Sequence, residues 1–138
     1  MKNGFLLTIR ILFPLYLLSV CLLCFLNLAF PDEMDIPHFI LGIPVDKIVH
    51  FMMFLPYPLL ATFFFSVTKS GIHLKFRKYV SVFLTGIVFA ALTELIQKYL
   101  LPARDGDILD FLADFFGLVI GIILVFILYP FLADKISR

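Results

Sequence analysis

Charged residues are scarce in this chain, and tryptophan is missing altogether. Only 15% of its 138 residues are charged. Soluble domains carry about 25% charged residues, so the composition excludes an ordinary water-exposed surface. The formal net charge of +1 gives no electrostatic basis for binding nucleic acid. Without tryptophan, any aromatic belt at a membrane interface must rest on tyrosine.

Hydrophobic residues, in contrast, make up 62% of the chain, and the mean hydropathy is +1.08. A single domain of this size cannot hide so much apolar surface from water. Four apolar stretches are long enough to cross a bilayer, whose hydrocarbon core needs about 20 such residues. They cover about 11–30, 48–67, 79–101 and 108–132. The sequence therefore predicts an all-α polytopic membrane protein, with residues 1–138 forming one domain of four transmembrane helices in a small bundle.

The basic residues predict the orientation of these helices. They gather in the first ten residues, in the connection between 69 and 78, and at the C-terminus, whereas nine of the ten acidic residues lie elsewhere. Four spans place the three basic regions on one side, and the positive-inside rule makes that side the cytoplasm. Both termini are therefore expected in the cytoplasm. The first stretch is expected to be an uncleaved anchor, because it is longer than the apolar region of a signal peptide.

Two cysteines, Cys21 and Cys24, lie one helical turn apart within the first stretch. Their spacing matches a Cys-x-x-Cys redox pair, but no βαβ pattern and no flanking charge accompany them. They are expected to pack against neighbouring helices or to face lipid.

Polar residues collect at the outward ends of the last three stretches. They are Asp46, Lys47, His50, Glu94, Gln97, Arg104, Asp107, Asp110 and Asp114. Ionisable groups within a membrane are costly and normally face a bundle interior or a wet cavity. We therefore expect these residues to line one binding pocket near the outer leaflet, walled by the second, third and fourth spans.

The fourth stretch carries its polar and small residues on one face. At about 100° per residue, Asp107, Asp110, Asp114, Gly117 and Gly121 occupy a stripe about 80° wide. Glycines four residues apart allow close approach of another helix. Gly117 and Gly121 are therefore expected to pack against a neighbouring span and to form the floor of the pocket.

These residues form three motifs in chain order: Asp46-Lys47-x-x-His50-Phe51-x-x-Phe54, Glu94-x-x-Gln97, and Arg104-x-x-Asp107-x-x-Asp110-x-x-x-Asp114-x-x-Gly117-x-x-x-Gly121. The series resembles the VanZ-like family over roughly residues 46–121. That family is named for a member associated with low-level resistance to the glycopeptide antibiotic teicoplanin. The resemblance implies a protein of the bacterial cytoplasmic membrane with a link to the cell envelope and to glycopeptide susceptibility. It implies no particular reaction.

The leading hypothesis is that the pocket binds or handles an envelope lipid or lipid-linked precursor. Arg104 would bind the phosphate through its planar fork, Lys47 would add a point charge, and His50 or Gln97 a hydrogen bond. Membrane lipids are the expected partners, among them a phosphorylated envelope lipid, and no cofactor is expected. Acyl or prenyl chains could lie on Phe51, Phe54, Phe63, Phe64 and Phe65, although plain lipid exposure is the simpler expectation for these rings.

Two alternatives stay open. The pocket could belong to a membrane-embedded enzyme acting on such a lipid, with a metal ion or with His50 as a base oriented by Asp46. No established zinc spacing is present, and we assign no catalytic residue. The chain could instead handle a proton or small cation, because five carboxylates face three bases and the excess must be compensated. No ionisable residue continues inward along the last three spans, so a complete translocation path is not visible.

Overall fold

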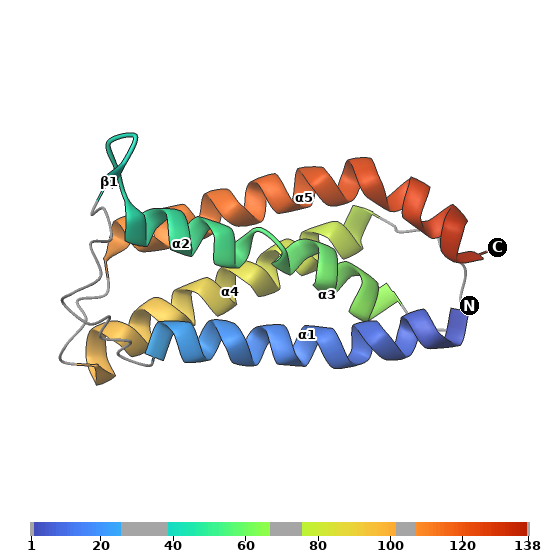
Figure 1. Ribbon diagram of the computed structural model, residues 1–138, viewed down its shortest axis with the longest axis horizontal. Helices are drawn as coiled ribbons and strands as arrows, with labels where there is room; N and C mark the ends of the chain where they lie inside the picture. Colours follow the sequence, from blue (N-terminus) through green and yellow to red (C-terminus); the bar gives the residue numbers. More distant parts are fainter. Residues whose placement is uncertain (1, 26–38, 67–75, 102–106, 138) are drawn as a thin grey trace.

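The computed structural model describes residues 2–25, 39–66, 76–101 and 107–137. Its helices are α1 (Lys2–Phe25), α2 (Val45–Phe54), α3 (Tyr57–Ser66), α4 (Phe76–Leu100) and α5 (Ile108–Ser137). A short antiparallel hairpin, β1 (Phe39–Ile40) and β2 (Ile43–Pro44), precedes α2. Figure 1 shows the helices lying lengthwise in one bundle, with both termini at the end opposite the hairpin.

Four helical stretches are long and apolar enough to cross a membrane. They are Leu7–Phe25, Val45–Phe65, Phe76–Leu100 and Ile108–Leu132. The prediction of an all-α, multi-pass membrane protein with four transmembrane helices is therefore confirmed. The first stretch starts earlier than predicted, and positions 26–30 of the predicted span lie outside the described residues.

The second span is built from two helices, because proline interrupts it. Pro56 has no N–H, so the carbonyl of Met52 loses the donor that a continuous helix would supply. The neighbouring carbonyl, that of Met53, accepts a hydrogen bond from the Tyr16 hydroxyl of α1. A neighbouring span thus supplies a donor at the break, in the way that membrane helices accommodate proline.

Aromatic and small residues fill the interior of the bundle. Phe54 and Phe63 are buried, and the Phe54 ring lies 5.5 Å from that of Phe89 in α4. Plain lipid exposure was therefore the wrong expectation for these two rings, because neighbouring helices cover them; Phe65 is half exposed. Cys24 is also fully buried, as expected of a cysteine that packs between helices.

Helix α5 lies directly against the broken second span. A Cβ added at Gly117 would lie 2.5 Å from the carbonyl oxygen of Phe51, and one at Gly121 would lie 2.5 Å from that of Leu55. The partner residue number rises along both segments, so the two run in parallel, as the second and fourth spans of a bundle must. This backbone contact fixes the height of α5 relative to α2 and so determines which polar side chains meet nearer the hairpin.

Candidate functional site

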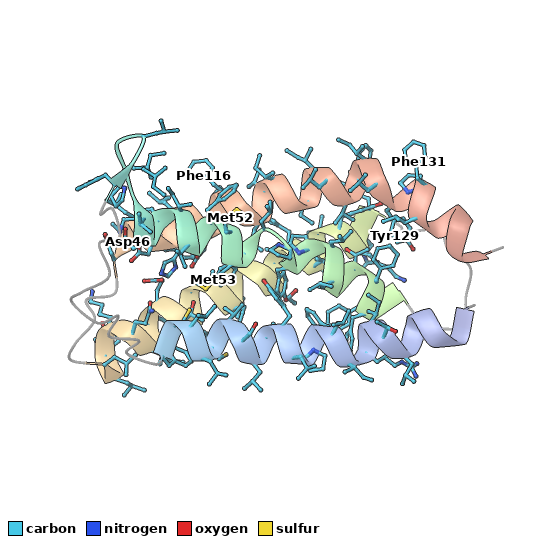
Figure 2. The ribbon with its side chains drawn as sticks, viewed as in Figure 1. Asp46, Met52, Met53, Phe116, Tyr129 and Phe131 are labelled. Atoms are coloured by element: carbon cyan, nitrogen blue, oxygen red, sulfur yellow. The ribbon has the colours of Figure 1, made fainter. Side chains whose placement is uncertain are left out.

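The polar side chains of α2, α4 and α5 gather at the hairpin end of the bundle. We call them the polar cluster: Asp46, Lys47, His50, Glu94, Asp107, Asp110 and Asp114. Figure 2 shows Asp46 where α2 begins beside α5, whereas the labelled Phe116 and Phe131 point away from the bundle. The cluster has an outer layer around Lys47 and an inner layer around His50, one helical turn deeper.

In the outer layer, one ammonium meets three carboxylates. Lys47 Nζ donates to Asp46 Oδ2 at 3.0 Å, to Asp107 Oδ2 at 2.8 Å and to Asp110 Oδ1 at 2.6 Å. The Lys47 side chain is only 15% exposed, so its charge is directed into these contacts. The arrangement joins the first turn of α2 to the first turn of α5.

Asp107 also caps the N-terminus of α5. Its carboxylate accepts the backbone N–H of Leu109 at 3.0 Å, and its carbonyl accepts those of Asp110 and Phe111. An aspartate at this position satisfies orphan donors and complements the helix dipole. The Leu109 N–H, followed by the Lys47 ammonium, holds the pKa of Asp107 below its ordinary value.

In the inner layer, two carboxylates converge on one imidazole nitrogen. His50 Nδ1 lies 3.0 Å from Asp114 Oδ1 and 3.6 Å from Glu94 Oε1. The three residues come from three helices, and all are buried: Asp114 is 0% and Glu94 9% exposed. The stripe of α5 that carries Asp114 continues into Gly117, so the close helix contact lies directly below this layer.

Three oxygens of the inner layer lack a hydrogen-bond donor. Within the described part of the chain, neither oxygen of Glu94 nor Oδ2 of Asp114 receives a hydrogen bond. Each buried acceptor left unsatisfied costs about 1–3 kcal/mol, and more when it is charged. A single Nδ1 proton cannot serve two carboxylates. The layer therefore requires a further proton or a bound cation, and His50, Glu94 and Asp114 are residue types that ligate metals.

The first span contributes contacts that the sequence did not reveal. Gln97, predicted to line the pocket, donates from Nε2 to the backbone carbonyl of Cys24 in α1 at 3.0 Å. Its amide thus ties α4 to α1. A backbone carbonyl is present at every residue, so no sequence signal could have identified this partner or shown that α1 packs beside the site.

Two expected roles differ from what the structure shows. In the enzyme alternative Asp46 would orient His50, but it turns to the ammonium of the adjacent Lys47 and is 57% exposed, while Asp114 from α5 holds the imidazole. Lys47 was expected to bind phosphate, yet three carboxylates already accept from its ammonium. Arg104, the expected phosphate ligand, lies outside the described residues.

Comparison with family models, curated proteins and solved structures found no match to this chain. The VanZ-like resemblance therefore stays a prediction from the three sequence motifs. What the site does is inferred below from the chemistry of its own side chains.

Proposed function

We propose that this chain is a VanZ-like protein of the bacterial cytoplasmic membrane, with both termini in the cytoplasm. In this proposal its polar cluster faces outward and binds or handles a phosphorylated cell-envelope lipid or lipid-linked precursor. The observation that carries the proposal is the gathering of seven ionisable side chains at the end of the bundle opposite the termini. A site at that level meets a lipid headgroup while the lipid chains stay in the hydrocarbon.

Helix packing alone does not account for the cluster. The contacts of Gly117 and Gly121 already bring α5 against the second span without any charge. Buried ion pairs are an inefficient source of stability, since apolar replacements are often neutral or stabilising. The retention of five carboxylates here therefore supports a ligand-binding role.

The contacts of Lys47 change the expected mode of binding. Because its ammonium is shared among carboxylates, phosphate recognition falls to Arg104, whose fork suits an oxyanion. The carboxylates of Asp46 and Asp107 are 57% and 39% exposed, and carboxylates accept hydrogen bonds from hydroxyl and amine groups. The proposal therefore favours a headgroup that combines phosphate with such donors.

A second candidate is an enzyme acting on the same lipid. It is favoured by the 3.0 Å contact between His50 and the buried Asp114, because a carboxylate that holds an imidazole is a recurring part of acid–base sites. The resemblance also carries a proposed link to glycopeptide susceptibility. That link can be tested by comparing teicoplanin sensitivity in cells with and without the protein.

Native mass spectrometry of protein released gently from its own membrane tests the lipid proposal. We expect a phosphorylated lipid bound to the unaltered chain and lost from Arg104→Ala. Lys98→Ala is the matched control, because Lys98 is an exposed base near the end of α4 and its loss should leave the lipid in place. A bare mass for the unaltered chain, or equal retention in Arg104→Ala, would contradict the proposal.

The proposed orientation has its own test. Reporter fusions within residues 69–78 should report a cytoplasmic location, because that connection carries four basic residues. An external location would invert the bundle and place the polar cluster at the cytoplasmic face.

A further inference from the structure

We propose that His50, Glu94 and Asp114 form a binding site for one divalent transition metal ion. The three side chains come from α2, α4 and α5, and one potential ligand atom from each lies within 4.8 Å of the others. Ligand atoms held about 2.0–2.2 Å from one ion are roughly 3–3.6 Å apart. The measured separations from His50 Nδ1, 3.0 Å to Asp114 and 3.6 Å to Glu94, fall in this range.

The unpaired oxygens provide an independent indication of a ligand. Asp114 is fully buried, and its Oδ2 receives no hydrogen bond from the described residues; the same holds for both oxygens of Glu94. Both carboxylates point toward the same imidazole nitrogen. They therefore enclose a position where a cation would meet acceptors that otherwise have no partner.

Charge and donor type indicate which cation fits. For Nδ1 of His50 to ligate, the neutral imidazole carries its proton on Nε2, and the metal ion takes the place of the Nδ1 proton that would otherwise bridge to Asp114. Two carboxylates and this neutral imidazole carry two negative charges, which a divalent ion neutralises and a single imidazolium proton does not. Calcium takes six to eight oxygen ligands and magnesium keeps several waters, whereas imidazole with carboxylates suits zinc, iron and related metals. Three protein ligands leave a coordination position open, as in catalytic zinc sites.

A metal here would deepen the proposed function. The described polar cluster has more acid than base, so it repels phosphate unless a cation is added. An ion with an open position would accept a phosphate oxygen at the outward end of the bundle. In this respect the inference rests on the proposed function, but metal binding itself is measured without any lipid.

Calorimetric titration with Zn²⁺ tests the site in the full-length chain, purified in detergent and stripped of metals with a chelator. We expect one Zn²⁺ per chain, with affinity at least about 100-fold weaker in Asp114→Asn and in Glu94→Gln. Loss of a residue that only hydrogen-bonds to a metal ligand already weakens metal affinity by about 10–100-fold, so loss of a ligand should weaken it at least as much. Lys98→Ala is the matched control, because this exposed side chain lies near the end of α4 and outside the polar cluster. No binding to the unaltered chain, or equal weakening in Lys98→Ala, would overturn the site.

Two further measurements separate the alternatives. If the variants lose helicity, the unaltered chain loaded with Co²⁺ decides: intense visible absorption of a four- or five-coordinate ion supports the site, and weak octahedral-type absorption overturns it. Lipid retention is then measured in Asp114→Asn. If Zn²⁺ does not bind but the unaltered chain retains lipid, the metal site is overturned and the proposed function stands. If Zn²⁺ binds but lipid retention does not depend on Arg104, the metal site stands and the proposed function is contradicted.

Discussion

Replacing Gly117 with alanine tests the contact between α5 and α2 directly. The added Cβ would lie 2.5 Å from the carbonyl oxygen of Phe51 and 3.2 Å from the backbone nitrogen of Leu55. Because both are backbone atoms, a helix must shift to make room. Such overpacking costs about 1–3 kcal/mol, while alanine in a helix is favoured over glycine by roughly 0.5–1 kcal/mol. We expect the free energy of unfolding to fall by about 1–2 kcal/mol.

The assay is unfolding in mixed micelles of rising dodecyl sulfate fraction, followed by the circular dichroism of the helices. Gly4→Ala is the control, because nothing lies within 4 Å of its added Cβ, and it should be neutral or slightly stabilising. The stability of Gly86→Ala should lie between those of Gly117→Ala and Gly4→Ala. Its added Cβ would lie 2.6 Å from the end of the Leu118 side chain, which can move more easily than backbone. A Gly117→Ala variant as stable as Gly4→Ala would refute the close backbone contact.

Four further substitutions probe the hydrogen bonds and ion pairs of the bundle in the same unfolding assay. Tyr16→Phe removes the donor to the Met53 carbonyl and should lower the free energy of unfolding by about 1–3 kcal/mol. Tyr57→Phe should lower it less, because the Tyr57 hydroxyl donates to another hydroxyl, that of Thr85. Equal losses in the two variants would contradict this reasoning. Lys47→Met leaves three carboxylates without their cation, so we expect a loss of about 2–4 kcal/mol at neutral pH that shrinks on acidification. The pKa of Asp107 in the folded chain lies below its ordinary value of 3.8, so the ionised carboxylate stabilises the fold at higher pH. This stabilisation is lost as the pH falls from 3.8 through the pKa of the folded state. The unaltered chain should then lose stability below about pH 4 more steeply than Asp107→Asn, and parallel curves would contradict the capping contact.

The sequence predicted the four spans and the face of α5 because both depend on local order. Hydropathy over about 20 residues identifies a span whatever its neighbours are. The helical period alone places Asp110, Asp114 and Gly117 on one stripe, and the structure turns that stripe toward α2. No knowledge of the partner helix was needed for either inference.

Pairing between helices could not be read in the same way. The spacing of Asp46 and His50 shows that they share a face of α2, but not that a buried acid from α5 lies nearer the imidazole. That choice depends on the height of α5 against the second span, which the backbone contact of Gly117 sets. The Tyr16 contact was hidden for another reason: its acceptor is a main-chain carbonyl exposed by a proline break.

The carboxylates and the glycines of the α5 stripe have different roles, although both face the second span. The deeper glycines supply close packing without charge. Replacing buried ion pairs by apolar residues is often neutral or stabilising by about 1–4 kcal/mol. A bundle that needed only stability would therefore extend its apolar contacts to the hairpin end. Instead, the described residues of the polar cluster place five carboxylates around one lysine and one histidine. These groups cannot neutralise one another, because acids outnumber bases even when His50 is protonated. Arg104, which lies outside the described residues, raises the number of bases only to three against five acids. The remaining charge must come from a proton, a metal ion or a cationic group of a ligand, and this imbalance favours a binding function over a purely structural one.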